Sequence, residues 1–396
     1  MKYWRLIFGI IFLALSGYGQ KSVFYRDVTV APLSASDKTK YSTEAVFFLP
    51  DGANGFKLFD SLSRERGITE LMRQGSQVKA FFNAASGEKL QLRLFSETVK
   101  HDTAVQESGV LHMVEKYNGT PIASVKAFES AWREGTFSGG GFEKRVYSGW
   151  NPYGSNYNSL HRYTGFIKIE KPGAYYFYTA STDASFLLID SQVVAAWPGR
   201  HGVNEGLYGQ HGGSINLTSG VHRFEYLHAN NQWSCYAIAA YRLPGKEKFQ
   251  VIPETLFTPS LEAESGSLHN RDGKAVADFF WDNEDMLEVD KLQMFRVKFS
   301  PASGCKVAGW NYGDGSGEQK SVNVHYYFRT GQYPVTMRTE AGNAKQTVAV
   351  TWRFRQNLIS ERDVAKYVAE ALNKRKPLEF SRRATVFWRR RFCSSN

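Results

Sequence analysis

Apolar and polar residues alternate along short runs through most of the chain, and turn residues separate these runs. The run 89–95 alternates strictly, with leucine at every second position, and it follows the run 77–82 across the turn Ser86–Glu88. Alternation with period two is typical of strands that bury one face. Such runs at a spacing of about 8–12 residues indicate sandwiches or barrels. The pattern predicts an all-β fold of several antiparallel β-sandwiches in tandem, with a hairpin over residues 77–95.

Two short segments favour helix instead. Residues 125–133 are expected to form a short helix. Near the C-terminus, Ser360 stands three positions before Asp363, which is a helix-start signature. The apolar residues that follow, up to Leu372, recur at helical spacing. We therefore expect a short C-terminal helix after the β-rich part of the chain.

The first twenty residues have the order of a secretory signal peptide. Lys2 and Arg5 precede the apolar run 6–15, and the small residues Gly17 and Gly19 follow it. This run is shorter than the about 20 residues that span a bilayer. The sequence therefore predicts export, to a secreted, periplasmic or cell-surface location. A buried N-terminal helix or an uncleaved anchor is the alternative.

Shifts in pattern and composition divide the chain into six expected parts, in keeping with typical domain sizes. They are a signal peptide (1–19), an N-terminal β domain of unknown role (20–134), a central sandwich (135–257), a linker (258–275), a second sandwich (276–352), and a short helix with a basic tail (353–396).

The net charge is +11, and most of the excess lies in the tail. Residues 374–396 hold eight lysines and arginines against one glutamate, so the rest of the chain is close to balanced. A balanced body without a basic stripe argues against nucleic-acid binding. The tail is interpreted either as a disordered end or as a contact to anionic membrane or cell-surface polymer.

The sequence carries no recognisable catalytic set. It has no HExxH, GxSxG or P-loop motif. The carboxylates between Asp282 and Glu288 are expected to lie solvated in a polar loop before a strand, not to pair for glycoside hydrolysis. The cysteines are Cys235, Cys305 and Cys393, which form no CxxC motif. We therefore predict that the protein is not an enzyme.

Five short motifs between residues 162 and 257 occur in a familiar order. They are Arg162-Tyr163-x-Gly165, Pro172-Gly173-x-Tyr175-x-Phe177, Asp183-x-Ser185-Phe186-Leu187-x-Ile189-Asp190, Gly220-x-His222-x-x-Glu225-Tyr226 and Ile252-Pro253-x-x-x-Leu256-Phe257. In this order and spacing they resemble the protective-antigen-type (PA-fourteen) domain, which occurs in the anthrax toxin protective antigen, bacterial glycosidases and yeast adhesins. The resemblance implies an antiparallel β-sandwich of a carbohydrate-binding family.

The resemblance also implies a calcium site with one residue changed. In sugar-binding members of that family, two consecutive aspartates hold a calcium ion that binds sugar hydroxyls, and Ca²⁺ prefers six to eight oxygen ligands. Asp183 matches the second aspartate, whereas Thr182 stands in place of the first. One fixed negative charge is missing, so calcium binding is expected to be weak or absent. Asp183 then serves to order a turn.

Loops around that turn supply further candidates for sugar contact. Sugar rings need a flat apolar platform and planar hydrogen-bond partners, which aromatic rings, amides and a guanidinium provide. The candidate ligand-binding residues are Thr182, Asp183, Trp197, Arg200, His201, Asn230, Asn231 and Trp233. The alternative is that Trp197 belongs to the core and that Asn230 and Asn231 form a simple turn.

Residues 307–337 carry a second resemblance. Trp310 precedes the turn Gly313–Gly315, and the motif His325-x-Tyr327-x-x-x-Gly331-x-Tyr333 follows. These motifs resemble the polycystic kidney disease (PKD) domain, an immunoglobulin-like sandwich. The resemblance implies that Trp310 lies in the core and that this part is a spacer or an adhesive module.

Together these patterns predict an exported, non-catalytic protein that binds carbohydrate or mediates adhesion through its central sandwich. The expected partner is a polysaccharide or glycoconjugate, with protein partners in the cell envelope as a further option. Two alternatives stay open. One is a structural spacer or protein-interaction scaffold without glycan binding, and the other is an accessory part of a glycoside hydrolase system.

Overall fold

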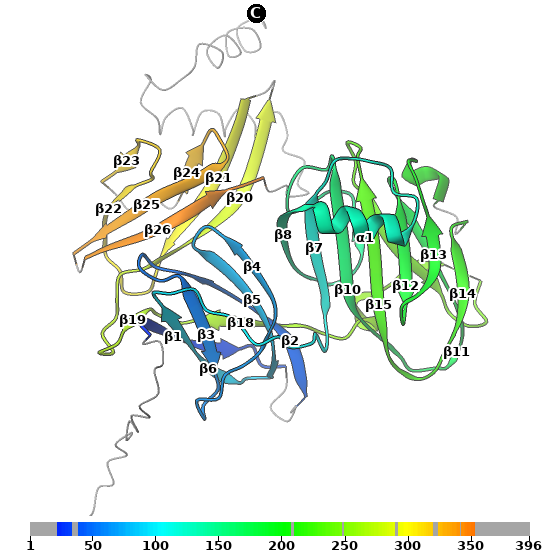
Figure 1. The fold of residues 1–396 in the computed structure, drawn as a ribbon, viewed down its shortest axis with the longest axis horizontal. Helices are drawn as coiled ribbons and strands as arrows, with labels where there is room; N and C mark the ends of the chain where they lie inside the picture. Colours follow the sequence, from blue (N-terminus) through cyan, green and yellow to red (C-terminus); the bar gives the residue numbers. More distant parts are fainter. Residues whose placement is uncertain are drawn as a thin grey trace, which may run out of the picture.

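The computed structural model describes residues 22–33, 39–206, 210–247, 249–289, 292–319, 324–340 and 342–352. These residues form three β-rich parts, and the all-β fold class is confirmed (Figure 1). The expected signal peptide, C-terminal helix and basic tail lie outside the described residues. Within the described part of the chain, no helix has the length and apolar character that crossing a membrane requires.

The N-terminal sheet is built from two stretches of chain that lie far apart in the sequence. Its strands run in the order β3–β6–β1–β18–β2–β5–β4, and β19 pairs with β1. Their bounds are β1 Phe24–Val30, β2 Lys40–Phe48, β3 Gly55–Phe59, β4 Ile68–Gln74, β5 Gln77–Ala85, β6 Lys89–Phe95, β18 Leu261–Ser265 and β19 His269–Asn270.

Strand β18 occupies the middle of this sheet. It pairs antiparallel with β1, where Val28 lies opposite Ser265, and parallel with β2, where Thr43 lies opposite Leu261. The expected linker over residues 258–275 is therefore wrong, because that segment contains two strands of the N-terminal sheet. The chain leaves this sheet after β6, builds the central sandwich and returns at β18 (Figure 1).

Strands β5 and β6 are consecutive in the sequence but do not pair with each other. β5 pairs with β2 and β4, and β6 pairs with β1 and β3. The predicted hairpin over residues 77–95 is therefore wrong. The predicted alternation is confirmed, because Leu90, Leu92 and Leu94 are all buried in the sheet's core. Alternation reports which face of a strand is buried, not which strand lies beside it.

The central sandwich packs a six-stranded sheet against a smaller second sheet. The first has the order β13–β12–β15–β10–β7–β8, and the second has the order β14–β11–β16–β17, with β9 also paired to β16. Their bounds are β7 Val110–Lys116, β8 Thr136–Glu143, β9 Tyr147–Ser148, β10 Ser159–Ile169, β11 Gly173–Ser181, β12 Ser185–Ile189, β13 Gln192–Trp197, β14 Gly212–Leu217, β15 Gly220–Asn230, β16 Ala237–Arg242 and β17 Gln250–Val251. Two short 3-10 helices, η1 Val203–Gly206 and η2 Glu254–Leu256, lie in its connections.

The sandwich begins earlier in the sequence than expected. Strand β7 pairs with β10 from Val110 onward, and β8 pairs with β7. The expected boundary at residue 135 therefore falls inside this part. Helix α1 (Val125–Glu134) forms where the helix was predicted, and the Ser124 side chain accepts a hydrogen bond from the Ala127 N–H at its start. Such a side-chain cap satisfies a backbone donor that the helix leaves unpaired.

The C-terminal sandwich has a sheet in the order β20–β21–β24 and a second in the order β23–β22–β25–β26. The bounds are β20 Phe279–Val289, β21 Leu292–Pro301, β22 Val307–Asn311, β23 Gly317–Glu318, β24 Val324–Tyr327, β25 Gly331–Thr339 and β26 Gly342–Val350. Trp310 is buried in its core, as predicted. The residues from Asp282 to Glu288 lie within β20, so the predicted polar loop is wrong.

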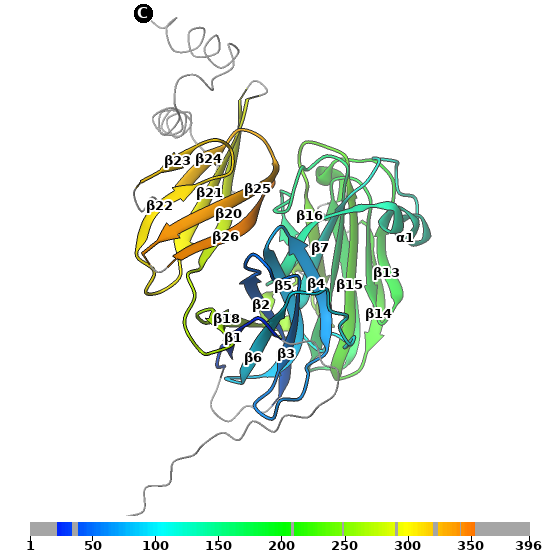
Figure 2. The ribbon, with the colours of Figure 1, turned by 60° about the vertical axis from the view of Figure 1, so that its left-hand side comes forward.

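A buried ion pair joins the N-terminal sheet to the C-terminal sandwich, which Figure 2 shows side by side. An Arg26 Nη2 nitrogen donates to Asp278 Oδ2 at 2.6 Å, and both side chains are almost fully buried. The guanidinium also donates to the carbonyl of Phe48, and Gln346 donates to the other oxygen of Asp278. Hydrogen bonds therefore compensate both charges, as burial of an ion pair requires.

We predict that Asp278→Ala destabilises the protein strongly, because it leaves the Arg26 charge buried without a partner. Removing one member of a buried ion pair costs about 3–5 kcal/mol. Urea denaturation measures this loss. The matched control is Glu65→Ala, which breaks a partly exposed ion pair with Lys57 in the same sheet and should cost less than about 1 kcal/mol. Equal losses for the two variants would contradict the prediction.

Asp314, in the turn after β22, is expected to make the stability of the C-terminal sandwich depend on pH in the acid range. Burial alone would raise the pKa of Asp314, but hydrogen bonds from His325 and Ser316 hold that pKa well below its usual range. A carboxyl group with a depressed pKa stabilises the fold above its unfolded pKa of about 3.9. That contribution is lost as the pH falls through the folded value.

We therefore expect Asp314→Asn to lower the Tm at pH 7 and to flatten the fall in Tm below about pH 4. Circular dichroism melts between neutral and strongly acidic pH measure both effects. Asp51→Asn, at an exposed position, should melt as the parent protein does at every pH. A variant at position 314 with an unchanged acid slope would refute this role of the carboxylate.

Candidate functional site

Three loops of the central sandwich meet around Asp183. They are residues 182–184 between β11 and β12, residues 198–202 after β13, and residues 231–236 between β15 and β16. The Asp183 carboxylate accepts the backbone N–H of His201 at 3.2 Å and that of Asn231 at 2.8 Å. It also accepts the side-chain amide of Gln232 at 2.5 Å. Asp183 thus holds the three loops together through contacts between distant residues, whereas the sequence offered it only a role in ordering its own turn.

The residues at this turn do not fit a calcium ion. Both oxygens of the buried Asp183 carboxylate face N–H donors, which repel a cation. The Thr182 hydroxyl accepts the Tyr236 N–H at 2.6 Å and lies 3.2 Å from the Ser234 carbonyl, to which it donates. Calcium needs six to eight converging oxygens, and here the candidate oxygens are already used within the protein.

Like Thr182 and Asp183, two further predicted contact residues are part of the interior. Trp197 is 7% exposed, and its ring is stacked between His201, at 3.5 Å between centroids, and His211, at 4.0 Å. Both faces of the indole are covered, so it offers no platform to a sugar. Asn230 is fully buried and donates to the carbonyls of Asn156 and Gln232. Both therefore shape the loops from inside.

Burial keeps the groups next to the Asp183 carboxylate neutral. Desolvation is the main cause that lowers the pKa of His201, so its imidazole carries no charge near neutral pH. Desolvation also raises the pKa of Tyr117 to about 12, and the negative charge of Asp183 adds to that rise. The carboxylate is thus stabilised by N–H donors and not by a neighbouring cationic imidazole.

The exposed part of the site is aromatic. Trp233 is 67% exposed, and its ring lies 6.2 Å from that of Trp150 at an interplanar angle of 84°. Tyr236, 41% exposed, lies over Gly149 in the same region. Arg200, in the loop after β13, is also exposed, and it donates to the Gly119 carbonyl at 2.9 Å. The sequence reasoning named Trp233 and Arg200 but missed Trp150 and Tyr236.

Backbone contacts fix this aromatic group in place. The Cys235 N–H donates to the Gly149 carbonyl at 3.0 Å, and the Asn156 side chain donates to the Trp233 carbonyl. These bonds join loop 149–158 to loop 231–236. The stretch 137–165 is rich in aromatic residues, and this is the sequence signal that could have identified Trp150.

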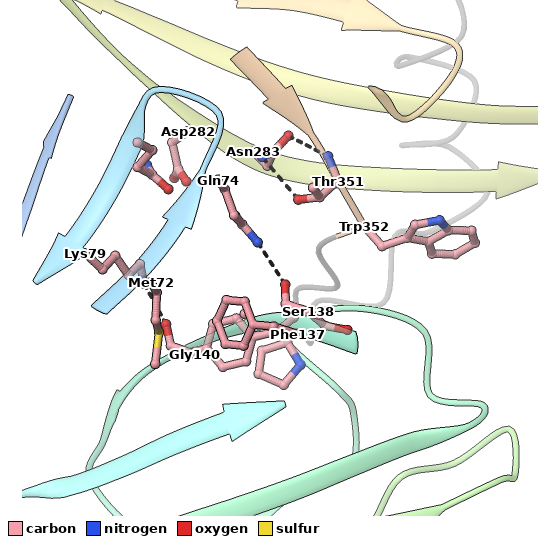
Figure 3. A pocket seen from close by; sticks show the side chains of 14 residues that line it. Met72, Gln74, Lys79, Phe137, Ser138, Gly140, Asp282, Asn283, Thr351 and Trp352 are labelled. Atoms are coloured by element: carbon pink, nitrogen blue, oxygen red, sulfur yellow. Dashed lines mark hydrogen bonds between the residues drawn. The ribbon is translucent and has the colours of Figure 1, made fainter. Parts of the chain in front are cut away.

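Two adjoining cavities lie where the three β-rich parts meet. In the smaller, of about 50 Å³, Gln74 donates to the Ser138 carbonyl and Lys79 to the Gly140 carbonyl (Figure 3). The larger has a volume of about 380 Å³. Its lining includes the aromatic and amide side chains of Tyr153, Tyr157, Trp352, Asn151 and Gln332. The walls come from all three parts, so these cavities depend on how the parts pack.

No family model matches the chain, and no curated protein matches it. Among solved structures, the PA14 sugar-binding domain from an RTX adhesin is similar to it at 15% identity and a TM-score of 0.33, over 39% of this chain and 98% of that chain. The PA14 domain of the MpAFP antifreeze protein has 11% identity and a TM-score of 0.34, over 41% of this chain and 97% of that chain.

A third similar structure is the Epithelial Adhesin 9 A domain from Candida glabrata in complex with Galb1-4GlcNAc. It has 11% identity and a TM-score of 0.29, over 39% of this chain and 90% of that chain. TM-scores this far below 0.5 carry no functional argument.

Both oxygens of the Asp183 carboxylate already accept hydrogen bonds, so we predict that the protein does not bind calcium. Millimolar Ca²⁺ should give no binding heat in calorimetry and no rise in Tm, because a ligand stabilises a protein only by binding its folded form. Removal of divalent ions with EDTA should likewise leave the Tm unchanged. A saturable binding heat that disappears in Asp183→Ala would contradict this prediction. It would show that calcium displaces the N–H donors from the carboxylate.

Proposed function

We propose that this chain is an exported, non-catalytic glycan-binding protein of the adhesive type. In this proposal the central sandwich contacts polysaccharide through Trp150 and Trp233 and does so without calcium. The observation that carries the proposal is the exposure of Trp233 at a loop that is otherwise hydrogen-bonded into place. The sequence resemblance to a carbohydrate-binding family supports the same conclusion.

A rigid exposed tryptophan is suited to a sugar ring. The indole presents a large apolar face, and the near-perpendicular arrangement with Trp150 gives two surfaces at an angle to each other. The loops are held by backbone bonds before any ligand arrives, so binding costs little ordering entropy. Polar groups at the rim, Arg200 and Asn231, supply hydrogen-bond donors of the kind that recognise hydroxyl groups.

The remaining parts fit an adhesive protein outside the cell. The resemblance of residues 276–352 to the PKD domain supports a role as a spacer. Such a spacer would hold the central sandwich at a distance from the surface to which the protein is attached. The signal-peptide pattern of residues 1–19 supports export. The basic tail supports contact with an anionic polymer or membrane through charge, as an additional attachment.

We expect Trp233→Ala to weaken retention on the bound polysaccharide by about tenfold, equal to about 1.4 kcal/mol. The indole face would be lost while the loop bonds of the backbone persist. Pull-down on insoluble polysaccharides and a glycan array measure the effect. Leu62→Ala, which removes an exposed apolar side chain from the turn between β3 and β4, is the control and should bind as the parent does.

A scaffold without glycan binding is the second candidate. The buried Arg26–Asp278 pair and the bond from Trp281 to Ser76 favour it, because they tie two parts into a rigid unit. A parent protein that retains no glycan on the array, or binding that is equal in Trp233→Ala, would overturn the glycan proposal in favour of the scaffold.

A further inference from the structure

Three side chains that the glycan proposal does not use meet inside the central sandwich. His161 on β10 and His228 on β15 are direct cross-strand partners, and Cys235 lies in the loop that follows β15. All three are buried. One nitrogen or sulfur atom from each lies within 4.8 Å of the other two, which is close enough for a shared metal ion after small side-chain rotations.

The hydrogen bond of His228 determines which nitrogen is free. Its Nε2 lies 2.8 Å from the carbonyl oxygen of Thr182, and a carbonyl can only accept. The proton is therefore on Nε2, and Nδ1 carries a lone pair. This Nδ1 is buried and has no hydrogen-bond partner among the described residues. An unsatisfied buried acceptor is costly, and a metal ion would satisfy it.

His161 has the support that metal-binding histidines have. Its Nδ1 lies 3.0 Å from Nε2 of His112, and Nδ1 of His112 lies 3.6 Å from Oε1 of Glu143. The Ser159 hydroxyl lies 2.9 Å from Nε2 of His161, a contact that a bound ion would replace. A proton on Nδ1 of His161, donated to His112, leaves the lone pair of His161 on Nε2. That atom lies 3.3 Å from Sγ of Cys235. Histidine ligands commonly donate their second N–H to a partner of this kind.

We propose that His161, His228 and Cys235 form a buried binding site for monovalent copper. Bonds of about 2.0–2.3 Å to one ion place its ligand atoms roughly 3.5 Å apart, close to the observed separation of Sγ and Nε2. Thiolate and imidazole together select copper or zinc.

Charge decides between copper and zinc. Cu⁺ with one thiolate and two neutral imidazoles has no net charge, whereas Zn²⁺ would leave a positive charge in a buried site. The Cys235 thiol gives up its proton when the Cu–S bond forms, so one proton is released for each Cu⁺ bound.

The site also connects the interior to the exposed aromatic group. Cys235 lies two residues after Trp233, and Thr182, which orients His228, precedes Asp183. Copper bound here would link β10, β15 and loop 231–236. The bound ion should therefore raise the Tm, and the gain in stability should grow with the logarithm of its concentration over its Kd.

Anaerobic titration with Cu⁺ in competition with a chromophoric chelator tests the proposal. The protein carries Cys305→Ser and Cys393→Ser, so Cys235 is its remaining thiol. We expect one Cu⁺ per chain, and X-ray absorption should detect one sulfur neighbour at about 2.3 Å. Adding Cys235→Ser should raise the Kd at least tenfold. His112→Gln, which removes the imidazole that contacts Nδ1 of His161 and does not touch the ion, should raise the Kd by roughly tenfold.

Three results would overturn the proposal. They are no retained Cu⁺, an equal Kd with and without Cys235, and Zn²⁺ bound more tightly than Cu⁺. Near-UV circular dichroism of each variant reports folding. If Cys235→Ser does not fold, His228→Gln tests the same site, because its amide still reaches the Thr182 carbonyl. Glycan retention is measured separately on the metal-free protein, so failure of either proposal is distinguishable from failure of the other.

Discussion

The pairing of β18 between β1 and β2 determines how the whole chain is arranged. A strand with neighbours on both edges cannot leave its sheet without breaking two ladders of hydrogen bonds. The central sandwich is therefore held by the N-terminal sheet at its entry and at its exit. The entry and exit also touch, because the Gly109 N–H donates to the Thr258 carbonyl at 3.1 Å. Two tethers that meet at one point restrict rotation far more than a single flexible linker would.

The same sheet also sets the position of the C-terminal sandwich. Asp278 directly precedes β20, and its ion pair with Arg26 ties the start of β20 back to β1. Ser76 adds a second tie, since its N–H donates to the Thr347 carbonyl and its hydroxyl accepts the Trp281 indole N–H. Buried polar contacts contribute little net stability compared with apolar packing, but a misplaced partner leaves them unsatisfied. They therefore favour one arrangement of the parts over others.

Hydrophobic patterns over a few residues predicted local structure well, but they did not predict contacts between distant segments of the chain. Alternation identified β6, and the helix over Val125–Glu134 and the buried Trp310 were also predicted correctly. The neighbours of β5 and β6 and the strand β18 were missed, because strand pairing depends on distant residues. The prediction that Trp197 contacts sugar was wrong for the same reason. His211, which directly precedes β14 of the second sheet, covers one face of its ring. The role of Asp183 was predicted only in part, because its carboxylate bonds to distant residues of two other loops.

Thr182 shows why the turn serves the protein's own structure. Its hydroxyl accepts from Tyr236 N–H and donates to the Ser234 carbonyl. A carboxylate could accept the first bond but could not donate the second, and its charge would face a carbonyl oxygen. The Thr182 carbonyl meanwhile fixes the proton of His228 on Nε2. Thr182 therefore orders the exposed loop through its hydroxyl and the lone pair of a buried histidine nitrogen through its carbonyl.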